Sequence, residues 1–207
     1  MPQLQETEER SKLRATLREK SLQQGRRFKL SSGAETDVYI DSKLTTFTPE
    51  AMPLVADAFI RKFEQCGWAP QAVGGRTIGA DPISYAIAFR SLARKPSIRA
   101  FTVRKEPKKH GMERFIEGLE ERDSRGLSVV IVDDVCTQGC STGDAIEKAR
   151  KAGMVVLGAV CLVDREQGAT EFLEKNYQCR LESVFKLSEI VANDESQAAS
   201  IPVGAHS

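Results

Sequence analysis

The feature that most constrains the fold is the alternation of strand-like segments with segments of helical pattern. The strand-like segments lie at residues 71–75, 99–105, 129–134 and 154–165, and most of their positions are apolar. Between them, residues 81–93 and 143–153 have the pattern of helices. Strands that are apolar on both faces must be covered on both faces, which is typical of parallel sheets. The sequence therefore predicts an α/β fold with a central parallel sheet flanked by helices on both faces.

The N-terminal part has a different pattern. Residues 8–24 predict a charged helix with Leu13 and Leu17 on one face, ended by Gly25. Residues 27–30 and 38–44 predict two short strands around a turn rich in small and polar residues. A further helix is expected from residue 48 to residue 63, although Pro53 weakens its first turns, and Gly67 fits its exit.

Composition and charge exclude several classes of protein. The chain has 207 residues, which suits one domain, and its formal net charge is +1, so any anion site must be local. The first 21 residues are polar and charged, and no later apolar run approaches the roughly 20 residues that a membrane helix needs. The five cysteines are odd in number and form no CxxC pair, which indicates reduced thiols in the cytoplasm and no metal site.

Glycines or charged residues stand at the ends of four of the predicted strands. They are Gly74 and Gly75, then Arg104 and Lys105, then Asp133 and Asp134, and finally Asp164 and Arg165. In an open α/β sheet, ligands bind beyond the carboxyl ends of the strands. The four strand ends therefore predict one polar site.

The loop after Asp133 and Asp134 suits a phosphate. It is built of small residues and leads into a helix, whose first N–H groups and partial positive charge favour an anion. Hydroxyl groups of Thr137 and Ser141 add donors. The acids can accept hydrogen bonds from sugar hydroxyls, so the combination indicates a ribose 5-phosphate group. Taken alone, the segment is also compatible with a strand end followed by a helix cap; the GxxxxGK[ST] and GxGxxG motifs do not occur.

Residues 129–141, four apolar residues followed by two acids and a loop of small residues, resemble the phosphoribosyl pyrophosphate (PRPP) signature of type I phosphoribosyltransferases. The resemblance implies that Asp133 and Asp134 hold the ribose hydroxyls and act in catalysis, and that the loop wraps the 5-phosphate. The loop residues are Val135, Cys136, Thr137, Gln138, Gly139, Cys140 and Ser141. Cys136 and Gln138 depart from the commonest pattern, which a loop that binds through backbone N–H groups can tolerate.

A second segment, RKEPKKHG at residues 104–111, resembles the catalytic loop of the orotate phosphoribosyltransferases. The resemblance implies that Arg104, Lys105, Lys108 and His110 bind the diphosphate of PRPP, with Lys108 the most important for catalysis. Cations over this leaving group stabilise the charge that grows in the transition state. Seen alone, such a run is more often a solvated charged surface. Its position after a strand and beside the predicted phosphate loop favours the functional interpretation.

Three further segments resemble the same family. Residues 72–82 resemble the family's glycine turn next to the pyrophosphate. Residues 163–169 resemble the segment whose arginine, here Arg165, pairs with the orotate carboxylate, with Thr137 also touching the base. Residues 28–43 resemble the family's hood, a small cap over the base, although Ser31 stands where many members have Lys. An ordinary surface salt bridge is the alternative for Arg165.

The resemblance implies a type I phosphoribosyltransferase fold with a small hood formed mainly by N-terminal elements. It implies one domain over residues 1–192, with the N-terminal helix and hood at about 8–48, the α/β core at 49–192, and a flexible tail at 193–207. The implied reaction joins orotate and PRPP to give orotidine 5′-monophosphate and diphosphate, in pyrimidine biosynthesis. Mg²⁺ is expected to arrive on the oxygens of PRPP, and a homodimer is expected to share the catalytic loop between subunits.

The sequence leaves two alternative functions open. One is a sister enzyme for a purine or for uracil, which Arg165 disfavours because neutral bases have no carboxylate. The other is a regulator that binds PRPP without chemistry, which the retained loop cations disfavour. Neither nucleic acid nor a membrane is expected as a partner.

Overall fold

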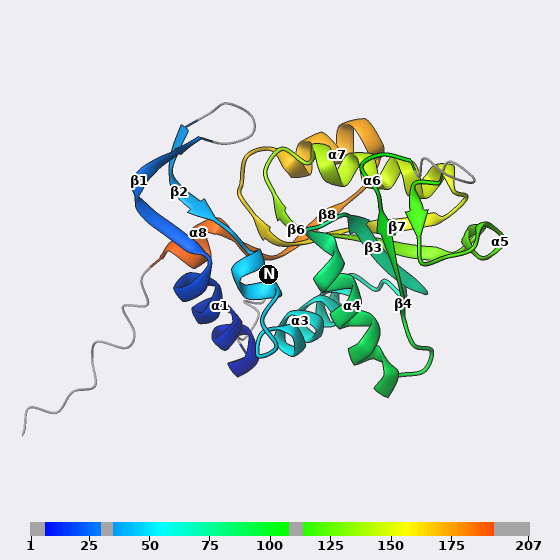
Figure 1. Ribbon diagram of the computed structural model, residues 1–207, viewed down its shortest axis with the longest axis horizontal. Helices are drawn as coiled ribbons and strands as arrows, with labels where there is room; N and C mark the ends of the chain where they lie inside the picture. Colours follow the sequence, from blue (N-terminus) through cyan, green and yellow to red (C-terminus); the bar gives the residue numbers. More distant parts are fainter. Residues whose placement is uncertain (1–6, 30–34, 108–113, 193–207) are drawn as a thin grey trace, which may run out of the picture.

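A computed structural model describes residues 7–29, 35–107 and 114–192 of the chain. Its centre is a six-stranded sheet in the order β5-β4-β3-β6-β7-β8, in which neighbouring strands are parallel except β5, which is antiparallel to β4 (Figure 1). The predicted parallel sheet is therefore confirmed. The strands are β3 (Ala72–Arg76), β4 (Arg99–Val103), β5 (Ile116–Glu117), β6 (Ser128–Cys136), β7 (Val155–Asp164) and β8 (Leu181–Lys186).

Helices cover both faces of this sheet, as the apolar strands require. Figure 1 shows α6 (Cys140–Lys151) and α7 (Ala169–Tyr177) on one face, and α1 (Glu8–Lys20), α3 (Met52–Gln65) and α4 (Ala80–Arg90) on the other. The side chains of β6 alternate between the two layers, because successive residues of a strand point to opposite faces. Val130 and Val132 join the core with α1, α3 and α4, whereas Val129 and Ile131 join the core with α6 and α7.

The first helix is shorter than predicted. It begins after Thr7, whose side chain accepts a hydrogen bond from the N–H of Arg10, and it ends at Lys20 rather than at Gln24. From Leu22 the chain forms β1 (Leu22–Lys29), which pairs with β2 (Glu35–Ile40) as an antiparallel hairpin. Pairing with β2 replaces the last helical turn, and Gly25, at φ +86°, lies at the irregular part of β1 instead of ending the helix.

The boundaries of two other helices also differ from the prediction. α2 (Lys43–Thr46) is a single turn, and the chain then bends, so α3 begins at Met52 instead of residue 48. Pro53 lies in its first turn, where the missing N–H costs nothing. α6 begins at Cys140, three residues before the predicted start, because Gly139 takes a positive φ of 80° and turns the chain into the helix.

The hydrophobic pattern did not identify the C-terminal elements. After α7 the chain adds β8 at the edge of the sheet and then α8 (Leu187–Val191), which packs beside α1. Two more short helices, η1 (Ser91–Ala93) and α5 (Glu121–Ser124), lie in connections. No helix in the three described ranges is long and apolar enough to cross a membrane.

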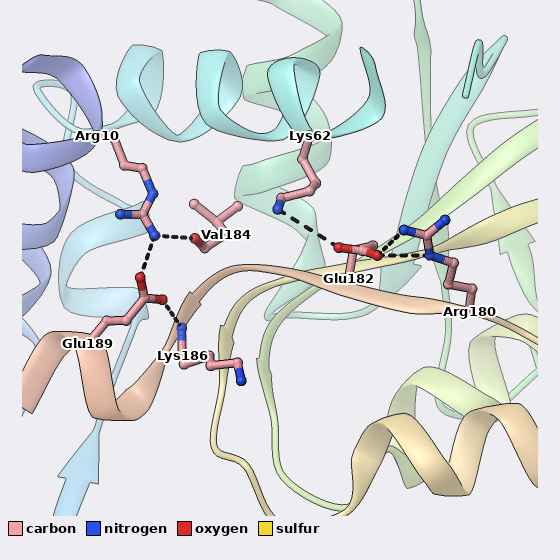
Figure 2. A network of polar contacts seen from close by, with 7 residues as sticks. All are labelled: Arg10, Lys62, Arg180, Glu182, Val184, Lys186 and Glu189. Carbon is pink, nitrogen blue, oxygen red and sulfur yellow. Dashed lines mark hydrogen bonds and ion pairs between the residues drawn. The ribbon is translucent and has the colours of Figure 1, made fainter. Parts of the chain in front are cut away.

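Polar contacts join this C-terminal edge to the helices beneath it (Figure 2). Arg10 of α1 donates to the carbonyl of Val184 at 3.1 Å and to Glu189 at 2.8 Å, and its guanidinium lies over the ring of Phe185. In a second group of contacts, Glu182 of β8 pairs with Lys62 of α3 and with Arg180. The contacts of Arg10 hold α1, and with it the start of the β1–β2 hairpin, against the edge of the sheet, and those of Glu182 hold α3.

Candidate active site at the carboxyl end of the sheet

The strands that carry polar residues at their ends are neighbours in the sheet. β4, β3, β6 and β7 are adjacent in this order, and their parallel register aligns Gly74 with both Phe101 and Ile131, and Cys136 with Asp164. Their carboxyl ends therefore meet along one edge, as the sequence predicted. The structure brings the acid pair, the glycine turn and the Asp164–Arg165 segment to that edge.

Asp133 is almost completely buried, with 5% of its surface exposed. Its Oδ2 accepts hydrogen bonds from Thr142 at 2.7 Å and Ser141 at 3.2 Å, and its Oδ1 accepts one from the backbone N–H of Asp134 at 3.0 Å. Burial, followed by the negative charge of Asp134, raises the pKa of Asp133 to about 7. The first acid of the pair is therefore held inside the protein beneath the start of α6.

Asp134 points to the opposite face of β6, because it is the next residue of the strand. Its Oδ2 accepts a hydrogen bond of 2.7 Å from the buried hydroxyl of Ser42, at the start of α2. Its Oδ1 lies so close to Gly79 that a Cβ at that position would overlap it. The two acids are thus not equivalent: Asp134 is half-buried on the side of α2 and α4, and Asp133 is enclosed on the side of α6.

The loop at residues 137–139 connects β6 to α6 and places the first turn of the helix at the edge of the sheet. The N–H of Gly143 bonds to the carbonyl of Gly139, so the N–H groups of residues 140–142 precede the first intrahelical bond. Free amides at the start of a helix are chemically suited to an anion. In this structure the hydroxyl of Ser141 donates to Asp133 at 3.2 Å, and its contribution to a phosphate stays a prediction.

The other residues of the loop differ in how far they are exposed to solvent. Gln138 and Cys140 are exposed, Val135 and Thr137 are half-buried, and Cys136 is buried with its sulfur 3.1 Å from the hydroxyl of Thr142. The exposed position of Gln138 gives its unusual side chain room to project away from the loop. The surface of the loop at the start of α6 therefore offers backbone groups more than side chains.

The glycine turn lets β3 lie close to its neighbours. A Cβ at Gly75 would overlap the carbonyl oxygen of Val132, and one at Gly74 would overlap Phe101. After these glycines come Arg76, whose guanidinium is paired with Asp144 of α6, and Thr77, which donates to Asp81 at 2.7 Å. A larger residue would displace β4 if it replaced Gly74, and the acid-bearing strand β6 if it replaced Gly75.

Arg104 and Lys105 lie just beyond β4, beside the glycine turn in the sheet. The side chain of Arg104 bonds to the carboxylate of Glu117 at 3.3 Å and to the carbonyl of Glu106 at 3.2 Å, and Lys105 is exposed. Lys148 of α6 donates to the carbonyl groups of both residues. Lys108, His110 and Gly111 of the predicted catalytic loop lie outside the described residues, as does Ser31.

Arg165 follows β7 and is buried, with 6% of its surface exposed. Its Nη2 donates to the carbonyl of Val38 in β2 at 3.1 Å, which excludes the surface salt bridge that was its alternative interpretation. Its Nε is buried and has no hydrogen-bond partner among the described residues. Burial lowers the pKa of this guanidinium. A buried cation with an unused donor is a suitable partner for an anionic group of a ligand.

Three contacts in the candidate site were not predicted from the sequence. Thr142 supports Asp133, Ser42 supports Asp134, and Lys148 holds the chain beyond β4. The sequence offers only a weak signal for each, because a Ser or Thr near a strand end is common and Lys148 belongs to a charged helix. No group of three or more His, Cys, Asp or Glu side chains that could hold a metal ion occurs within the described ranges.

Comparisons with known proteins identify orotate phosphoribosyltransferases as relatives. The chain is 44% identical over 185 residues to the orotate phosphoribosyltransferase of Aquifex aeolicus, which covers 88% of this chain and 98% of that protein. It is 41% identical to the orotate phosphoribosyltransferase of Sorangium cellulosum, over 79% of this chain and 83% of the relative. No family model matches the chain.

Solved structures of orotate phosphoribosyltransferases are also similar to this chain. The crystal structure of Mycobacterium tuberculosis orotate phosphoribosyltransferase in complex with 5-phospho-α-D-ribosyl 1-diphosphate superposes with a TM-score of 0.72 at 32% identity. The match covers 88% of this chain and 98% of that one. The fold described above is therefore shared with a protein whose crystal structure contains this ligand.

Proposed function

The chain belongs to the orotate phosphoribosyltransferases and has their type I phosphoribosyltransferase fold, and on that basis we propose how its own residues carry out the reaction. The reaction joins orotate to PRPP and gives orotidine 5′-monophosphate and diphosphate, a step of UMP biosynthesis. The observation that carries the proposal is the meeting of three features at one edge of the sheet. These are the carboxylate of Asp134, the N-terminus of α6, and the unused Nε of the buried Arg165.

Asp134 is proposed to bind the ribose, because it is the acid of the pair that is not enclosed by hydrogen-bond donors from α6. Its carboxylate accepts the ribose hydroxyls, and its negative charge stabilises the positive charge that develops on the ring as diphosphate leaves C1. Asp133 completes the acid pair from inside the protein. It fixes Ser141 and Thr142, and with them the first turn of α6.

The 5-phosphate is proposed to bind residues 135–141 at the start of α6. The N–H groups of the first helical turn and the helix dipole supply most of the attraction. Val135, Cys136, Thr137, Gln138, Gly139, Cys140 and Ser141 form this loop. Since the backbone supplies the donors, the unusual Cys136 and Gln138 are compatible with the role.

Arg165 is proposed to bind the orotate carboxylate, with Thr137 beside the base. The relatives' names specify orotate as the base they use, and a buried guanidinium with a free donor gives a physical reason for the same choice here. A neutral base would leave this donor without a partner, at a cost of about 1–3 kcal/mol. Val38 of the hairpin accepts from the same guanidinium, which supports the assignment of residues 8–48 as helix and hood within one domain of residues 1–192.

The diphosphate is proposed to bind Arg104, Lys105, Lys108 and His110, with Lys108 giving the largest loss of turnover when it is removed. Mg²⁺ is proposed to arrive on the diphosphate oxygens of PRPP, where a small hard cation prefers phosphate and water ligands to a cage of side chains. Asp134 lies at the same edge and can accept hydrogen bonds from water on that ion.

We also propose a homodimer that shares the catalytic loop. α4 and the adjoining turns expose Ile78, Tyr85, Phe89 and Leu92, and Phe89 is 78% exposed. Large apolar side chains grouped on one helix face are typical of an interface. A second copy of the chain is the partner proposed for this surface, because the catalytic loop is expected to be shared between subunits. The cytoplasmic location expected from the sequence stays a prediction.

The test is loss of orotate absorbance in the presence of PRPP and Mg²⁺, for the native chain and for Lys108→Ala. Turnover that collapses in Lys108→Ala and persists in Lys175→Ala, an exposed lysine of α7, would support the proposal. Uracil and adenine are measured in parallel. Diphosphate release with either of them and none with orotate would contradict the assignment of Arg165 and of the substrate.

A further inference from the structure

Lys148 of α6 is the common donor to two carbonyl groups beyond β4. Its Nζ lies 3.1 Å from the carbonyl oxygen of Arg104 and 3.4 Å from that of Lys105. The third partner is Asp144, one turn earlier in α6, at 2.9 Å. The ammonium also lies 4.3 Å from the centre of the Phe115 ring, and only 12% of the side chain is exposed. Lysine has three N–H donors, so these contacts use all of them.

These contacts fix a segment that the sheet holds only weakly. β4 lies between β3 and β5, and its ladder with β5 consists of two residue pairs, continued by one bond from the N–H of Arg104 to the carbonyl of Phe115. The carbonyl groups of Arg104 and Lys105 point instead to α6 and accept from Lys148. A charged donor makes stronger hydrogen bonds than a neutral one, and burial strengthens them further.

Lys148 also belongs to the helix that begins at the phosphate loop. Two turns of α6 separate it from Cys140, the first residue of the helix. Its partner Asp144 is paired with Arg76 at the end of β3 as well. The contacts of Asp144 and Lys148 therefore join α6 to the end of β3 and to the backbone of Arg104 and Lys105.

We propose that Lys148 is a positioning residue that sets Arg104 and Lys105 at a fixed distance from the phosphate loop, without touching substrate itself. The inference rests on the proposed function, in which these two cations bind the diphosphate while the start of α6 binds the 5-phosphate of the same molecule. PRPP spans both sites, so an error in their separation affects the reacting bond. A displacement of about 1 Å can cost on the order of a hundredfold in rate.

The test compares Lys148→Met, Lys148→Arg and the control Lys151→Met. Methionine keeps an unbranched apolar chain against Phe115 but cannot donate to the carbonyl groups, and arginine restores a cationic donor. Lys151 lies one turn later, is 72% exposed and pairs with Glu147. We expect Lys148→Met to lower kcat by roughly tenfold to a hundredfold and to raise the KM for PRPP, with the KM for orotate unchanged. Arginine should recover part of the loss, and Lys151→Met should match the native enzyme.

Hydrogen exchange gives a readout that does not need turnover. In Lys148→Met, a peptide covering residues 101–107 should exchange faster, while peptides from α6 and the thermal midpoint stay close to native values. If the native chain does not use orotate, the proposed function fails and the exchange comparison still decides whether Lys148 anchors this segment. The inference is overturned if Lys148→Met matches Lys151→Met in kinetics or in exchange. It is also overturned if kcat falls only together with the thermal midpoint and the KM for orotate rises equally.

Discussion

Replacing Asp133 with asparagine should change how stability depends on pH. Asp133 is buried, its two oxygens accept hydrogen bonds from Thr142, Ser141 and the N–H of Asp134, and burial raises its pKa from 3.8 to about 7. Between about pH 4 and about pH 7 the folded protein therefore binds more protons at this position than the unfolded chain does. The native protein loses stability as the pH rises through that window, and the loss is complete above it.

The size of the change in the free energy of unfolding follows from the pKa shift of Asp133. One pKa unit corresponds to about 1.4 kcal/mol, so a shift from 3.8 to about 7 corresponds to about 4 kcal/mol of lost stability above pH 7. Asparagine does not ionise and is nearly the same size. The free energy of unfolding of Asp133→Asn, relative to the native protein, should therefore rise by about this amount between about pH 4 and about pH 8.

The measurement is urea denaturation of both proteins at closely spaced pH values, with m-values checked for constancy. Asp123→Asn serves as control, because Asp123 lies at the surface and pairs with Arg99 at 3.4 Å; its difference from the native protein should stay within about 1 kcal/mol at every pH. Parallel pH curves for the native protein and Asp133→Asn would show that Asp133 ionises as readily in the folded state as in the unfolded chain. That result would refute the structural argument from burial.

Three further outcomes are expected. In Gly79→Ala, the new Cβ would overlap the Oδ1 of Asp134. The variant should therefore have a higher KM for PRPP and a kcat/KM at least roughly tenfold lower, with an unchanged circular dichroism spectrum. Native kinetics would contradict the placement of Asp134. Arg165→Leu should raise the KM for orotate by about tenfold to a hundredfold and change the KM for PRPP little, and equal changes in both would argue against a specific contact with the base. Phe89→Glu should convert a dimer to a monomer in light scattering, and an unchanged mass would move the interface away from α4.

The sequence was sufficient for the framework of the site because each of its signals is local. Apolar strand segments predict a covered parallel sheet, and the residue after each strand is then placed at one edge by topology alone. The glycines of β3 were also readable as part of the site at the strand ends. The boundary of α1 was not, because residues 21–24 are compatible with a helix until β2, farther along the chain, offers them strand partners.

The contacts that the sequence missed join residues far apart in the chain or depend on the face of an element. Ser42 reaches Asp134 across 92 positions, and Lys148 reaches the carbonyl of Arg104 across 44. Neither contact leaves a periodic pattern, since a single polar residue next to a helix start or on a charged helix is ordinary. The β8 strand was missed for a related reason: it is short and carries charged residues at an edge of the sheet, so its apolar pattern is weak.

The same geometry explains why two adjacent acids need not share one role. In a strand, neighbouring side chains point to opposite faces, so one acid of the pair faces α6 and the other faces α2 and α4. Ser42, which holds Asp134, directly follows the hairpin, and Arg165, which is proposed to bind the base, donates to Val38 within it. Both contacts come from the segment of residues 38–42. Under the proposed roles of Asp134 and Arg165, a change in the hairpin should therefore affect ribose binding and base binding together.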